Sequence, residues 1–67
     1  MPIDVRLEEI LDERGLTLTE LSDAVGITVA NLSILKTGKA RAIRFTTLDA
    51  ICEALDCRPG DLLDYRP

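Results

Sequence analysis

Basic side chains in the middle of this 67-residue chain are the group best suited to binding an anion. Residues 24–48 contain no Asp or Glu, whereas Lys36, Lys39, Arg41 and Arg44 give that stretch a charge of +4. The other residues together carry −8, which makes the net charge −4. Such an asymmetry is typical of a phosphate-facing surface on an acidic domain. The alternative is a solvated loop whose cations balance acidic neighbours, and the sequence pI of about 4.5 lies far from the basic norm of phosphate-backbone binders.

Cys52 and Cys57 are the other residues whose chemistry has to be considered, because two thiols can form a disulfide, half of a zinc site or a redox pair. Four residues separate them, which differs from the Cys-x2-Cys pattern, and the chain has no His to complete a four-coordinate zinc site. We expect buried thiols in a reducing compartment, no metal and no cofactor. Because neither His nor another base lies beside the thiols, the sequence predicts no enzymatic activity.

Length and composition predict one small domain over residues 1–67. A chain this short buries only roughly 60% of its unfolded surface, which favours a binding module over an enzyme with a deep substrate cleft. The apolar fraction of 46% is too high for a disordered chain. No apolar run approaches the roughly 20 residues of a membrane span, and residues 1–4 lack the pattern of a signal peptide. We therefore expect a soluble, cytoplasmic protein with no membrane partner.

Helix signals dominate the chain and predict an all-α fold of five short helices. The helices are expected over residues 4–14, between 17 and 26, over 29–37, over 47–55, and as a single turn from 59 onward. The chain ends, residues 1–5 and 64–67, could pair as a minimal two-stranded sheet.

Local signals indicate where these helices begin and which side chains face the core. Thr17 and Glu20 match a capping box at the start of the second helix, and Thr46 and Asp49 match a variant of it before the fourth. Phe45 is placed to act as a hydrophobic staple on that fourth helix. The apolar residues expected to point inward are Leu7, Ile10, Leu11, Leu21, Ala24, Val25, Leu32, Leu35, Leu48, Ile51, Cys52, Leu55, Leu62 and Leu63.

Two of the expected helices form a recognisable unit between residues 17 and 38. They are short and are joined by a turn of about four residues that contains Gly26, which matches the helix-turn-helix arrangement. Over nearly its whole length the chain resembles the phage repressor and Cro family of small regulators, the XRE type. The residues that carry the resemblance are Leu16, Thr17, Glu20, Leu21, Ala24, Val25, Gly26, Ile27, Thr28, Asn31, Leu32, Ser33, Leu35, Gly38, Lys39, Ile51, Ala54, Leu55, Asp61 and Leu62.

This resemblance implies a transcriptional regulator that binds double-stranded DNA. In the family the third helix enters the major groove, and members commonly bind palindromic operators as homodimers.

The sequence departs from the family pattern on the surface that would meet DNA. The position that usually anchors a backbone phosphate at the start of the second helix, typically Gln, is Leu18. The base-reading positions of the third helix are Val29, Ala30 and Ile34, and none of these side chains can donate or accept a hydrogen bond. Helical spacing places Ile34 opposite the core residues of this helix, so core packing does not explain it.

Two interpretations of this apolar face remain open. In the first, the third helix still binds DNA, with its apolar residues packed on thymine methyl groups, polar contacts from Thr28, Asn31 and Ser33, and phosphates bound by the cations. The DNA-binding residues expected on this interpretation are Thr28, Val29, Ala30, Asn31, Ser33, Ile34, Lys36, Lys39, Arg41 and Arg44. In the second, the motif is a protein-protein interaction module in which a partner covers Leu18, Val29 and Ile34.

A homodimer is expected because a monomer of this size offers few phosphate contacts. The candidate dimer residues are aromatic and aliphatic side chains for which little internal core is expected to be left near the chain end, namely Ile43, Phe45, Leu62, Leu63 and Tyr65. The alternative for each of them is that it closes the core of its own domain.

Overall fold

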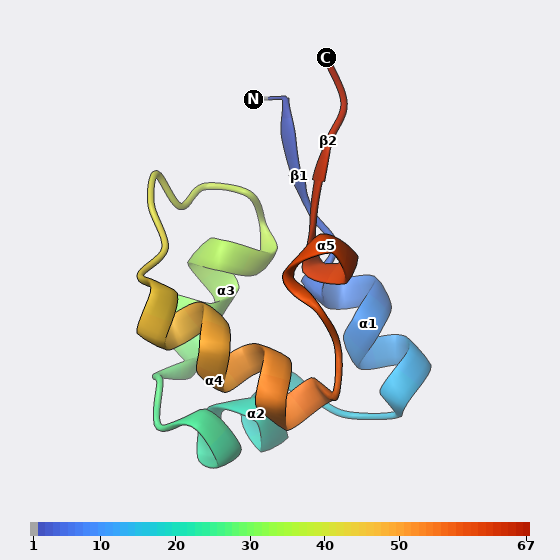
Figure 1. Cartoon of the computed structure of the whole chain (residues 1–67). Coiled ribbons are helices and arrows are strands. Elements are labelled where there is room, and N and C mark those ends of the chain that lie inside the picture. Colours follow the sequence, from blue (N-terminus) through green and yellow to red (C-terminus); the bar gives the residue numbers. More distant parts are fainter. Residues whose placement is uncertain (1) are drawn as a thin grey trace.

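The computed structural model describes residues 2–67 as five short helices and a two-stranded sheet (Figure 1). In chain order the elements are β1 (Ile3–Val5), α1 (Leu7–Arg14), α2 (Leu18–Val25), α3 (Val29–Lys36), α4 (Phe45–Leu55), α5 (Pro59–Leu62) and β2 (Leu63–Tyr65). The predicted all-α class with five short helices is confirmed. Within residues 2–67 no single helix is long and apolar enough to span a membrane. Only α2 and α3 taken together have that length and apolar composition, and a bend of 118° separates them.

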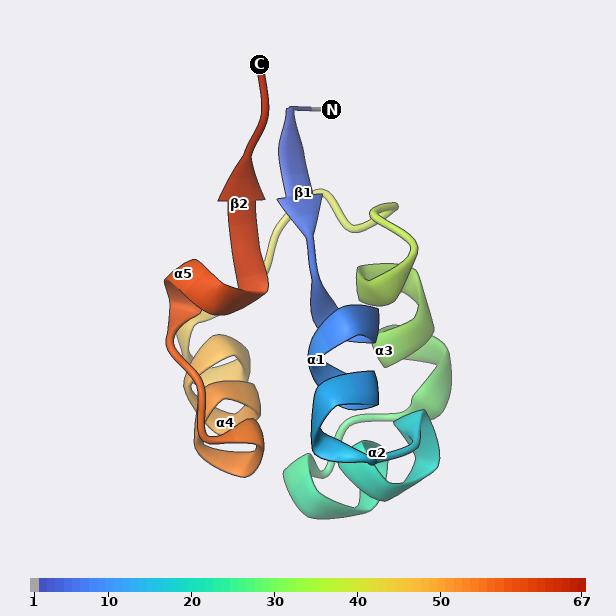
Figure 2. The same cartoon turned by 90° about the vertical axis from the view of Figure 1, so that its right-hand side faces the viewer.

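The sheet joins the two ends of the chain, and its strands extend side by side away from the helices (Figure 2). The strands run antiparallel, with Ile3 opposite Tyr65 and Val5 opposite Leu63. The predicted pairing of the chain ends is therefore confirmed, although the second strand begins at Leu63, one residue before the predicted range. Met1, which was included in the predicted pairing, lies outside the described residues.

The first helix begins later than predicted, at Leu7 instead of residue 4. Asp4 and Val5 belong to β1, and Arg6 is the N-cap residue but makes no side-chain capping bond. The backbone N–H of Arg6 donates to the carbonyl of Leu62 at 2.7 Å, which ties the start of α1 to the end of α5. Pairing with a strand far along the chain thus overrides the local helix preference of these residues.

The core lies where the helices converge and consists of leucine and isoleucine side chains. The buried residues are Leu7, Ile10, Leu11, Leu21, Leu32, Leu35, Leu48, Ile51, Leu55 and Leu62. Each of them was predicted to point inward, and Val25, Cys52 and Leu63 pack half-buried at the margin of this core. The prediction for Ala24 is wrong, because this residue is exposed and α2 buries only Leu21 completely.

The start of α4 also differs from the prediction. The helix begins at Phe45, and Arg44 takes the extended N-cap conformation with φ −76° and ψ 146°. Thr46 consequently lies inside the first turn, where it cannot form the predicted capping box with Asp49. Phe45 is 87% exposed and does not act as a staple. The final helical turn does begin at Pro59, as predicted.

Candidate nucleic-acid interface

α2 and α3 form a helix-turn-helix whose turn depends on a glycine. The helix axes differ by 118°, and Gly26, Ile27 and Thr28 join them. Gly26 has a φ of +71°, in the left-handed region, and donates its N–H to the carbonyl of Ser22 at 2.9 Å to end α2. Thr28 begins α3, because its Oγ1 accepts the N–H of Asn31 at 3.2 Å. The predicted motif is confirmed, and its angle falls in the usual range of about 90–120°.

A capping box fixes the start of α2. The Oγ1 of Thr17 accepts the N–H of Glu20, and the Oε1 of Glu20 accepts the N–H of Thr17, each at 3.1 Å. This confirms the predicted box, which stabilises the helix by about 1 kcal/mol. The next residue, Leu18, is half-buried against the core. Of the patch predicted to receive a protein partner, Val29 and Ile34 are therefore the residues that remain exposed.

The outer face of α3 is apolar and open to solvent. Val29 is 41% exposed and Ile34 47% exposed, and Ala30 is also exposed. Leu32 and Leu35 point the opposite way into the core. The helix phase expected from the sequence is thus confirmed, and the three positions predicted to read bases lie on the surface.

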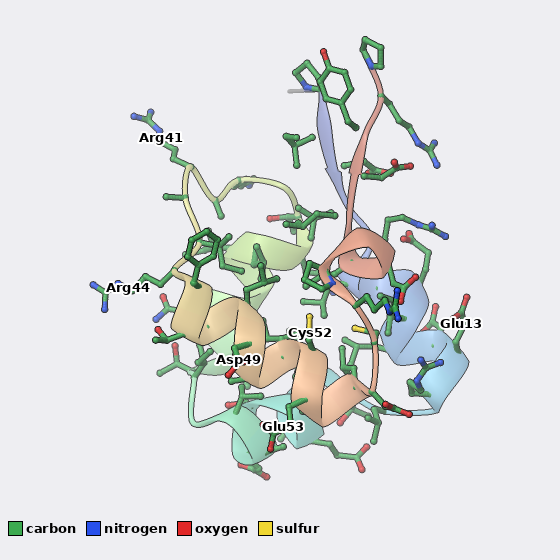
Figure 3. The ribbon with its side chains drawn as sticks, in the orientation of Figure 1. Glu13, Arg41, Arg44, Asp49, Cys52 and Glu53 are labelled. Carbon is green, nitrogen blue, oxygen red and sulfur yellow. The ribbon has the colours of Figure 1, made fainter. Side chains whose placement is uncertain are left out.

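The four cations between residues 24 and 48 are not neutralised by carboxylates of the described residues. Within residues 2–67, Lys36, Lys39, Arg41 and Arg44 take part in no ion pair, whereas three of the other four arginines lie 3.5–3.9 Å from carboxylate oxygens. Lys36 is half-buried and the other three are exposed. Figure 3 shows Arg41 and Arg44 pointing into solvent on the side of the molecule opposite Glu13. Arg41 and Arg44 are therefore available to an external anion on that side.

A groove of about 580 Å³ lies between α3 and the segment that leads into α4. Thr28, Asn31 and Ile34 line it from the helix, and Ala42 and Arg44 line it from that segment. The fold thus brings a capping threonine, an amide, an apolar side chain and a guanidinium to one concave surface. A nucleic-acid backbone that entered the groove would meet Arg44 on one wall and the first turns of α3 on the other.

Not all predicted site residues share this groove. Lys36 lines a separate pocket near β1, with Asp4 and Gly38 among its neighbours. Conversely, Ala42 and Thr47 line the groove but were not predicted as site residues. No charge or hydrogen-bonding pattern in the sequence distinguishes them, and only the path of the chain from α3 into the first turn of α4 places them there.

The predicted dimer residues divide into buried and exposed groups. Leu62 is 0% exposed and fills the core of its own domain, so core closure is its role. Ile43 and Leu63 are half-buried against the same core. Phe45 and Tyr65 remain on the surface, 87% and 63% exposed. Of the five, these two aromatic residues are the ones open to a second copy of the chain.

The cysteines are free and half-buried, which is less burial than was predicted. The backbone N–H of Cys57 donates to the carbonyl of Cys52 at 3.0 Å, just beyond the end of α4. Burial, reinforced by the neighbouring Cys52, raises the pKa of the Cys57 thiol to about 11. This thiol is therefore protonated at neutral pH, which suits packing and opposes nucleophilic reactivity.

This chain is similar to known proteins in family, in sequence and in structure. The family model of the Cro/C1-type HTH DNA-binding domain matches residues 6–67. A relative from Bacillus subtilis (strain 168), described as the uncharacterized HTH-type transcriptional regulator YozG, is 59% identical over 66 residues, which cover 98% of this chain and 79% of that protein. The crystal structure of the transcriptional regulator VanUg (Form II) has a TM-score of 0.76 and 33% sequence identity, and the match covers 100% of this chain and 91% of that one.

Proposed function

This chain belongs to the Cro/C1-type helix-turn-helix family, and we propose that it binds duplex DNA with α3 in the major groove and with residues 39–44, the basic segment, on the flanking phosphates. It is a DNA-binding transcriptional regulator, as its family and its similarity to two transcriptional regulators indicate. Neither the family nor these relatives favours the alternative of a protein-protein interaction module. Its role is that of a binding protein, with no catalytic step assigned to any of its residues.

The single observation that carries this DNA-binding mode is the set of unpaired cations around α3. Lys39, Arg41 and Arg44 are exposed and free of ion pairs within residues 2–67, and no Asp or Glu lies between residues 24 and 48. These cations attract a polyanion, although the domain as a whole carries a net charge of −4. These cations would bind phosphates and position α3, while Asn31 and Thr28 at the start of that helix offer polar contacts to the DNA.

The protein would bind its operator as a homodimer, because one protomer supplies few phosphate contacts. Phe45 is the candidate centre of the dimer surface, since an aromatic side chain that is 87% exposed has almost none of its apolar area covered by its own domain. A symmetric dimer would present two α3 helices to the two halves of a palindromic operator. We also propose that the protein is located in the cytoplasm.

Reversing two charges on the basic segment tests this mode. The variant carrying both Lys39→Glu and Arg41→Glu should lose binding to a fluorescein-labelled random-sequence duplex in an anisotropy titration at about 50 mM salt. Arg58→Glu is the control for position, at half the charge change, because Arg58 is also exposed and free of ion pairs within residues 2–67 but lies beyond the other end of α4. It should retain wild-type affinity.

Circular dichroism and thermal melting should show that both proteins are folded, since none of the substituted side chains is in the core. Wild-type affinity in the Lys39→Glu and Arg41→Glu protein would contradict the proposed phosphate contacts.

A further inference from the structure

The outer face of α3 offers almost no hydrogen-bonding groups to a base. Helical geometry spreads Val29, Ala30 and Ile34 over an arc of about 140°, with Ser33 and Thr37 between them. The hydroxyl of Thr37 donates to the carbonyls of Ser33 and Ile34 at 3.0 and 3.2 Å, so its proton is used within the helix. Ser33 is half-buried and adds one small hydroxyl to the arc. What remains for an external partner on this arc is mainly aliphatic surface.

In the major groove, the only apolar group that a base pair presents is the 5-methyl group of thymine. Guanine is normally recognised by the paired donors of Arg or Lys, and the arc itself carries neither. Lys36 lies about 20° beyond Val29 on the helix, but it is half-buried and lines the pocket beside β1. Asn31 flanks the arc on one side, and an Asn amide pairs well with adenine, the partner of thymine. Aliphatic side chains and a neighbouring amide together therefore match an A·T-containing half-site better than a G·C-rich one.

We propose that α3 reads thymine methyl groups through Val29, Ala30 and Ile34, so that the preferred operator carries thymine at the base pairs that face this helix. The inference rests on the proposed DNA-binding mode. DNA is the occupant that the surroundings of the arc favour, because unpaired cations and no carboxylates border it in the sequence. Removal of these methyl groups should weaken binding without altering the phosphate contacts.

Exchange of thymine for uracil tests the proposal directly, because the two bases differ only by the methyl group. A random-sequence duplex library is selected on the wild-type protein, and the recovered pool is amplified once with dTTP and once with dUTP. Anisotropy titrations should show tighter binding of the thymine pool, by about fourfold for each methyl in contact. Both pools should have the same salt dependence, since their phosphates are identical.

Two alanine variants assign the effect to α3. Ile34→Ala should reduce the preference for the thymine pool by about fourfold and leave binding of the uracil pool nearly unchanged. Ile3→Ala is the matched control, because Ile3 is 45% exposed, close to the 47% of Ile34, but lies on β1. It should retain the full preference for thymine.

The possible outcomes separate thymine reading by α3 from the DNA-binding mode on which it rests. Equal binding of the two pools by the wild-type protein would overturn thymine reading and leave the DNA-binding mode intact. A thymine preference that Ile34→Ala does not reduce would also overturn the assignment to this face of α3. Failure of both pools to bind at about 50 mM salt would instead refute the DNA-binding mode, and the inference with it.

Discussion

Added salt should weaken DNA binding by an amount that the unpaired cations determine. Each phosphate neutralised by Lys or Arg releases condensed counterions, and the logarithm of the binding constant falls by about 0.9 per contact for each tenfold rise in salt. When Lys36, Lys39, Arg41 and Arg44 all reach phosphates, the slope is about −3.6 per protomer. Affinity then falls about 150-fold between about 50 and about 200 mM salt. A dimer bound to one operator would have twice this slope.

Neutralisation of one cation tests the count of contacts. Lys39→Gln removes one phosphate contact, so the slope should change to about −2.7 and the same rise in salt should cost only about 40-fold. Arg58→Gln removes an equal charge beyond the far end of α4 and should keep the wild-type slope. The assay is an anisotropy titration of one labelled duplex at several salt concentrations. A wild-type slope shallower than about −1, or equal slopes for Lys39→Gln and wild type, would refute the reasoning.

Two further predictions concern stability and assembly. Leu32→Ala should lower the free energy of unfolding by about 2–5 kcal/mol, because Leu32 is 1% exposed and its truncation leaves a cavity. Ile34→Ala on the same helix should change the free energy of unfolding by less than about 1 kcal/mol. Equal melting curves for the two variants would contradict the observed helix phase. Phe45→Ser should convert a dimer of twice the 7.4 kDa chain mass into monomers when measured by light scattering, and a wild-type protein that is already monomeric would exclude Phe45 as a dimer contact.

Features set by neighbouring residues could be predicted from the sequence. The capping box of Thr17 and Glu20 closes within one helical turn, so its residues alone specify it. The turn at Gly26 needs a left-handed backbone, which glycine adopts without steric cost. The inward phase of Leu32 and the outward phase of Ile34 follow from the helical repeat of the apolar residues. These local rules were sufficient to predict the helix-turn-helix.

Predictions failed where distant segments decide the outcome. Asp4 and Val5 matched a helix start, but the strand that pairs with them lies near the other end of the chain. Thr46 matched a cap, but the path of the preceding segment makes Arg44 the N-cap residue and leaves Phe45 in solvent. Ala24 kept the helical spacing of a core residue, yet α2 turns it to the surface.

For the candidate site, the sequence alone determined which residues carry charge and which face of α3 is apolar, because composition and helical periodicity are local properties. Only the tertiary structure decided that Arg44 and the first turns of α3 share one groove, and that Lys36 lies apart from it. The same packing decided that Leu62 fills the core while Phe45 stays exposed. Proximity between elements depends on how their buried faces fit together, and no spacing within one element encodes that fit.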